Sequence, residues 1–175
     1  MTRASPSGIL AEPNEMQRKT ISLKVNGQQR NVDVEVRATL LDMVRDQLGL
    51  TGAKLGCDIQ VCGACTLLLD GKPVSACSFL AVDADGCDIL TIEGLSKKES
   101  LHPLQESFME FGALQCGYCT SGFILTAKAL LDECSQPSEQ QIKDYLAGNF
   151  CRCGCYQEIV QAVKNAAGLE VRGKV

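Results

Sequence analysis

The sequence predicts an α+β chain in which a small β-rich half precedes an all-helical half. Three observations carry this prediction: strand-like alternation of apolar residues near the start, a change to helical periodicity after Gly94, and eleven cysteines that fall into two groups. Of the 175 residues, 45% are hydrophobic and 22% are charged, as in a folded globular protein.

Composition and charge exclude several classes of protein. The net charge of −4 argues against a nucleic-acid surface, which needs clustered Lys and Arg. No apolar run approaches the roughly 20 residues that a membrane-spanning helix needs. The single histidine, His102, excludes a His-rich metal cluster, and we expect it at the surface or capping a helix.

The eleven cysteines indicate metal ligation rather than a disulfide scaffold. Their number is odd, and the first 16 residues show neither the apolar core of a signal peptide nor a twin arginine. We therefore expect a reduced, cytoplasmic protein.

The elements of the β-rich half follow from alternation and turn residues. Residues 1–19 are expected to be a flexible tail, and the first domain is expected over 20–94. Apolar side chains alternate at 21–25 and 32–36 around an Asn26-Gly27 hairpin turn, and Thr39 is expected to cap a short helix that ends at Gly49. Two further strands are expected at 66–69 and 89–92.

The second domain is expected over 101–168, after a linker at 95–100 and before a tail at 169–175. Apolar stripes with helical spacing run through 104–111, 123–131, 142–146 and 159–167. Ser138 and Gln141 form a capping box at the start of the third stripe.

The first cysteine group lies in the β-rich half and has a diagnostic spacing. Four residues separate the first two cysteines, two separate the next pair, and eleven precede the last. This is the plant-type ferredoxin spacing for a [2Fe–2S] cluster, and zinc is the alternative. Gly56, Gly63 and Ala64 leave room for backbone N–H groups to point at the cluster. The group consists of Cys57, Cys62, Cys65 and Cys77.

The second cysteine group lies in the helical half and consists of Cys116, Cys119, Cys151 and Cys153. Its first pair opens one predicted helix and its second pair precedes another. Helix N-termini favour thiolates and anionic clusters. On spacing alone, zinc remains a competitor at this group.

Three segments carry a resemblance to a known family. GCDIQVCGACTLLLDG (56–71), QCGYC (115–119) and NFCRC (149–153) resemble the small iron–sulfur subunit of the molybdenum hydroxylases, also called the xanthine oxidase family. The resemblance implies a plant-type ferredoxin-like (β-grasp) domain followed by an all-α four-helix-bundle domain, each with one [2Fe–2S] cluster.

The resemblance also implies a function. The chain is expected to carry electrons from a molybdopterin centre on a large subunit through both clusters to FAD on a medium subunit, in a dimer of heterotrimers. The eight cysteines are the expected ligands, with the second group nearer molybdenum. Gln115 is expected to hydrogen-bond the pterin, and Cys153 is expected to approach it. Substrate-binding catalytic residues are expected on another subunit.

Three departures from the family pattern stand out. Gln60 replaces a common Gly, Ser121 replaces a usual Pro, and Cys155 adds a third cysteine just after Cys153. We expect Cys155 to be a packed spectator, like the remaining Cys87 and Cys134.

Two other classes of function remain open at this stage. One is a free-standing two-cluster ferredoxin, which would elute alone on size exclusion. The other is a zinc-binding interaction module, which would be colourless.

Overall fold

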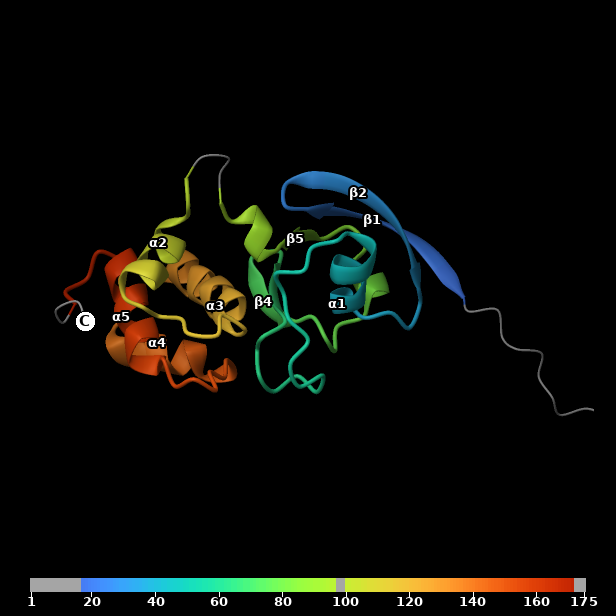
Figure 1. The fold of residues 1–175 in the computed structure, drawn as a ribbon. Coiled ribbons are helices and arrows are strands. Elements are labelled where there is room, and N and C mark those ends of the chain that lie inside the picture. Colours follow the sequence, from blue (N-terminus) through green and yellow to red (C-terminus); the bar gives the residue numbers. More distant parts are fainter. Residues whose placement is uncertain (1–16, 97–99, 172–175) are drawn as a thin grey trace, which may run out of the picture.

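The structure is a computed structural model that describes residues 17–96 and 100–171. A mixed β-sheet is followed along the chain by helices, which confirms the predicted α+β class (Figure 1). Parts of the expected tails and linker, residues 1–16, 97–99 and 172–175, lie outside the described residues. The four-helix-bundle arrangement stays a prediction.

A five-stranded sheet in the order β2-β1-β5-β3-β4 forms the first half. The β1–β2 hairpin turns at Asn26-Gly27, whose φ angles of 51° and 80° suit a two-residue type I′ turn. β5 runs parallel to β1 and antiparallel to β3, so it joins the hairpin to the β3–β4 pair. The strands are β1 (Arg18–Val25), β2 (Gln28–Glu35), β3 (Thr66–Leu69), β4 (Lys72–Ser75) and β5 (Asp88–Leu90).

The strand predicted at 89–92 ends at Leu90 in the structure, because Thr91 hydrogen-bonds to the Asn26 side chain instead of continuing the sheet. The Thr91 N–H donates to Asn26 Oδ1 and Asn26 Nδ2 donates to Thr91 Oγ1, both at 2.9 Å. The chain then forms the 3-10 turn η3 (Ile92–Gly94). At the other end of the sheet, β1 begins at Arg18, so the expected tail ends before residue 19.

A short helical segment buries its apolar side chains in the same core as the sheet. Thr39 caps it as predicted, in a capping box with Asp42, and Gly49 follows with a φ of 71°. Only α1 (Leu40–Asp42) is α-helical, and η1 (Met43–Gln47) is a π-helix, which the sequence pattern did not indicate. The second 3-10 turn of this half is η2 (Ala81–Ala84).

The second half is helical, and two of its helices, α2 and α4, begin at a residue whose side chain caps them. His102 and Ser138 each form a capping box, and Pro103 occupies the first turn of α2. No helix within the described residues is long and apolar enough to cross a membrane. The elements are α2 (Pro103–Glu110), α3 (Thr120–Glu133), α4 (Glu139–Tyr145), the 3-10 turn η4 (Leu146–Gly148) and α5 (Tyr156–Ala166).

Helix α3 belongs to both cores and holds the two halves together. It contacts β3 and β4, and its Leu125 and Ala129 lie in the core of the sheet half. Its Phe123 and Leu130 lie in the core of the helical half. A helix that packs on both sides must be apolar nearly all round, as α3 is. Figure 1 shows α3 between the sheet and the other helices.

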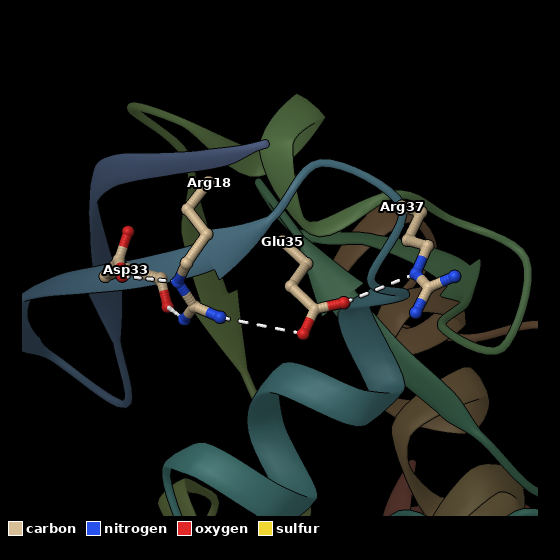
Figure 2. A network of polar contacts seen from close by, with 4 residues as sticks. All are labelled: Arg18, Asp33, Glu35 and Arg37. Atoms are coloured by element: carbon tan, nitrogen blue, oxygen red, sulfur yellow. Dashed lines mark hydrogen bonds and ion pairs between the residues drawn. The ribbon is translucent and has the colours of Figure 1, made fainter. Parts of the chain in front are cut away.

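The outer face of the β1–β2 hairpin carries a network of ion pairs (Figure 2). Arg18 Nε lies 2.6 Å from Asp33 Oδ2, and Glu35 lies between Arg18 and Arg37, at 3.6 and 3.3 Å. Exposed pairs of this kind contribute little to stability. The hairpin is therefore held mainly by its buried face.

Candidate metal centres

The first cysteine group is built on one loop and the end of one strand. Cys57 and Cys62 lie in an irregular loop, Cys65 directly precedes β3, and Cys77 follows β4. The Lys54 N–H donates to the Ala64 carbonyl at 3.0 Å and closes the base of the loop. Cys65 and Cys77 are buried, whereas Cys57 and Cys62 are half-buried. The structure thus brings the four predicted residues to one end of the sheet.

Backbone N–H groups surround the sulfur of Cys57. The N–H groups of Val61 and Cys62 each donate to Cys57 Sγ at 3.3 Å. Bonds from the N–H groups of Ile59, Val61 and Cys62 lower the pKa of Cys57 to about 6. Burial has the opposite effect at Cys65, where it raises the pKa to about 11. The loop therefore stabilises an anionic sulfur at its tip, as an anionic cluster requires.

Small residues are necessary in this loop, as the sequence predicted. A Cβ on Gly56 would lie 2.7 Å from Cys62 Sγ, and Gly63 has a φ of 67°. Asp58 and Gln60 also have positive φ, 59° and 62°, which is costly for residues that carry a side chain. The larger residue at position 60 therefore keeps a backbone conformation that favours glycine.

The second cysteine group lies where two helices begin. Cys119 is the N-cap of α3, and Cys151 and Cys153 lie in the loop between η4 and α5. Bonds from the Tyr118 N–H and then from the Cys153 side chain lower the pKa of Cys116. Burial and the neighbouring Cys151 raise the pKa of Cys119 to about 12.

At Cys151, burial is the largest single influence and raises the pKa, but hydrogen bonds from backbone N–H groups and from the Cys119 side chain together outweigh it. Those of Cys155, Cys153 and Gly154 contribute, and the net pKa is lowered. The Cys151 N–H in turn donates to the Tyr156 hydroxyl at 2.9 Å. This loop, like the first, is arranged to stabilise negative charge on sulfur.

Within each group the thiols lie in pairs. The side-chain hydrogen bonds between thiols join Cys57 to Cys62, Cys65 to Cys77, Cys116 to Cys153 and Cys119 to Cys151, and weaker charge interactions link the two pairs within each group. Within residues 17–96 and 100–171, no three His, Cys, Asp or Glu side chains converge as for a single metal ion. A [2Fe–2S] cluster has four cysteine ligands shared between two irons, so paired thiols fit it.

Cys155 is buried at the start of α5, where it is the N-cap residue. It lies beside Cys151, and burial followed by that neighbour raises its pKa. This placement agrees with a packed residue next to the second group, and its role as a spectator stays a prediction. Cys87 and Cys134 are only half-buried.

The remaining residues of the cysteine motifs and the single histidine differ in their exposure. Gln115 and Arg152 are exposed, and Cys153 is half-buried. His102 accepts a hydrogen bond from the Leu104 N–H at 3.2 Å, so it is the capping residue that we expected.

A cavity of about 250 Å³ joins the two groups. Two cysteines of each group line it, together with Gly56, Ala64, Tyr118, Phe150 and Arg152. The Phe150 N–H donates to the Cys62 carbonyl at 2.9 Å. Groups that are 50 to 100 residues apart in sequence thus face a common space.

The junction around this cavity includes residues that the sequence did not reveal. The buried Asn149 donates from Nδ2 to the Gly63 carbonyl at 3.1 Å. Tyr118 and Ser121 donate hydroxyl hydrogen bonds into the first loop. The available signal was only that these residues lie within or beside the cysteine motifs.

Comparisons with known proteins agree with two cluster-binding domains. A family model described as "2Fe-2S iron-sulfur cluster binding domain" matches residues 23–89, and one described as "[2Fe-2S] binding domain" matches residues 91–164. The nicotine 6-hydroxylase small subunit of Paenarthrobacter nicotinovorans is 46% identical over 159 residues, which cover 91% of this chain and 96% of that protein. The nicotinate dehydrogenase small FeS subunit of Eubacterium barkeri is 46% identical over 151 residues, covering 86% and 96%.

Solved structures show the same arrangement. A chain of quinoline 2-oxidoreductase from Pseudomonas putida 86 superposes with a TM-score of 0.82 at 46% identity, covering 91% of this chain and 99% of that one. The aldehyde oxidoreductase of Desulfovibrio gigas superposes with a TM-score of 0.82 at 45% identity. There the match covers 86% of this chain but 17% of the other, so the same fold occurs as part of a much longer chain.

Proposed function

The chain belongs to the family of small iron–sulfur subunits of the molybdenum hydroxylases, and from that premise we propose that it carries electrons from a molybdopterin centre to FAD. It is one component of an oxidoreductase and has two [2Fe–2S]-binding domains. The molybdopterin would lie on a large partner subunit, with FAD on a medium one. The observation that carries the proposal is the common cavity lined by cysteines of both groups.

The residues present fit two clusters. Each group offers four thiols in two pairs, and the space beside Cys62 would be filled by any side chain at Gly56. The first group would hold the cluster nearer FAD and the second group the cluster nearer molybdenum. When bound, the clusters supply one-electron transfer, which this chain tunes through N–H groups directed at sulfur.

The surface around the cysteine loops supports contact with partner subunits. Gln115 and Cys116 are exposed, although Gln115 is expected to meet the pterin and Cys116 a cluster. Large apolar side chains are exposed on these loops and at the start of α5, and exposed apolar surface of this kind is typical of interaction sites. They are Leu55, Ile59, Val61, Leu114, Tyr118, Phe150 and Tyr156.

The proposed domains are those expected from the sequence, a ferredoxin-like domain at 20–94, which β1 extends back to Arg18, and a helical domain at 101–168. The proposed assembly is a dimer of heterotrimers in the cytoplasm. The two relatives described above match nearly end to end and are themselves named as small subunits, which supports separate partner chains.

The proposal is tested by purifying the tagged chain from its native host and measuring molybdenum, flavin and iron across a size-exclusion profile. We expect all three to elute together with this chain in one large complex. A chain that carries iron but elutes alone would be a free electron carrier, which contradicts the proposal.

The role of Gln115 is tested in the same complex with Gln115→Ala. Substrates named for relatives, such as nicotinate, quinoline, an aldehyde or xanthine, are first screened for one that reduces the wild-type clusters. We expect the variant to keep its iron and to reduce more slowly with that substrate. Gln136→Ala, at an exposed glutamine between α3 and α4, is the matched control. Reduction at the control rate would remove Gln115 from the pterin site.

A further inference from the structure

The segment at 51–55, which leads into Cys57, has no regular secondary structure, so its carbonyl groups need partners outside a sheet or helix. Arg45, which lies in the sheet half, donates hydrogen bonds to two of these carbonyl groups. Its Nη1 donates to the Thr51 carbonyl at 3.0 Å and to the Ala53 carbonyl at 2.5 Å. One side of the segment is therefore fixed by its own domain.

Two hydroxyl groups of the helical half bind two more of these carbonyls. Tyr118 Oη donates to the Leu55 carbonyl at 2.6 Å, and Ser121 Oγ donates to the Gly52 carbonyl at 2.8 Å. Tyr118 lies between the first two cysteines of the second group, and Ser121 lies in the first turn of α3. Both hydrogen bonds therefore run from residues beside Cys119 of the second group to the segment at 51–55, which precedes Cys57 of the first group.

The serine at position 121 makes a hydrogen bond between the two halves that the sequence did not indicate. Proline, the usual residue there, has no hydroxyl and makes no such bond. Ser121 is buried, and its hydroxyl crosses between the halves instead of capping its own helix. Tyr118 also lines the cavity that cysteines of both groups share.

We infer that Tyr118 and Ser121 form a hydroxyl latch that, alongside the Asn149 and Phe150 hydrogen bonds of the same junction, sets the separation of the two cysteine groups and thereby the coupling between the clusters bound there. The inference rests on the proposed function. The latch consists of the two hydroxyls and the carbonyls of Leu55 and Gly52. Both residues are positioning residues, since neither hydroxyl is a ligand. Without them two carbonyls lose their partners, and the end of the loop before Cys57 can move away from α3.

The test compares the purified complete complex with the double variant Tyr118→Phe/Ser121→Ala. These substitutions remove both hydroxyls and little volume. Both proteins are reduced with dithionite, and pulsed electron paramagnetic resonance measures the magnetic interaction between the reduced clusters. A matched control, Tyr145→Phe/Ser78→Ala, removes hydroxyls that bond to Glu133 and to Ser75 within their own halves.

We expect the wild type and the control to show the same interaction, and the double variant to show a measurably weaker one while its iron content stays unchanged. A magnetic interaction of wild-type strength in the double variant would overturn the inference. The inference would also fail if the wild type showed no magnetic interaction between its clusters. If the double variant loses iron, Tyr118→Phe alone must retain iron and show a weaker interaction, or the inference fails. A wild-type chain with fewer than four irons would overturn the proposed function itself.

Discussion

The contact between Gly122 of α3 and the first cysteine loop gives the sharpest prediction about stability. A Cβ on Gly122 would lie 2.1 Å from the Gly63 carbonyl oxygen and 3.1 Å from Asn149 Nδ2. That carbonyl cannot turn aside easily, because Asn149 Nδ2 at 3.1 Å and the Thr66 hydroxyl at 2.7 Å both donate to it. Gly122→Ala must therefore push α3 and the loop apart.

The magnitude follows from three effects. Overpacking of this kind costs about 1–3 kcal/mol. Loss of the buried Asn149 hydrogen bond adds about 1 kcal/mol. The better helix propensity of alanine returns up to about 1 kcal/mol. We expect a net destabilisation of about 1–3 kcal/mol, which lowers the unfolding temperature of a chain of this size by about 2–12 °C.

The assay is thermal unfolding of the iron-loaded protein followed by circular dichroism, with iron content measured before and after heating. Gly148→Ala is the matched control, because a Cβ there meets nothing within 4 Å. Its free energy of unfolding should stay within about 1 kcal/mol of the wild type. Equal unfolding temperatures for the two variants would refute the argument that backbone contact between α3 and the loop needs glycine.

Three further predictions concern single residues. At Gln60, where φ is 62°, Gln60→Gly should be about 1 kcal/mol more stable to thermal unfolding than Gln60→Ala, and equal stabilities would contradict the strain. Burial, followed by the charge of Lys128, lowers the pKa of His102 from its usual 6.5. The neutral imidazole therefore stabilises the fold above pH 6.5, and this contribution is lost as the pH falls through the folded-state pKa. His102→Asn should flatten this part of the pH–stability curve, and a variant curve with the wild-type slope would exclude His102 as the source of the pH dependence. Cys155→Ala should keep both electron paramagnetic resonance signals whereas Cys153→Ala alters the one nearer molybdenum, and the reverse result would make Cys155 the ligand.

The sequence predicted those turns and helix caps that depend on residues close together in the chain. The Asn26-Gly27 turn, the Thr39 cap and the Ser138 capping box all appear as expected, because each depends on residues a few positions apart. The apolar stripe of α3 was also visible, although its packing in two cores was not. β4 has no alternating pattern and is set by its pairing with β3.

The candidate site divides in the same way. The cysteine spacings indicated both groups, because one loop supplies three thiols of the first group and two short motifs supply two thiols each to the second. The junction between the groups could not be predicted, because its bonds join residues 63 to 86 positions apart. Ser121 shows this most clearly, since its sequence context indicated only a tolerated helix start, whereas its hydroxyl reaches Gly52.

Chemical analysis of the purified native protein tests directly whether this one chain holds two [2Fe–2S] clusters. Iron, acid-labile sulfide and zinc are measured per chain, and dithionite reduction is followed by electron paramagnetic resonance. We predict four irons, four sulfides, no zinc and two distinct signals from the reduced protein. Two irons per chain, or zinc in place of iron at either cysteine group, would contradict the central claim.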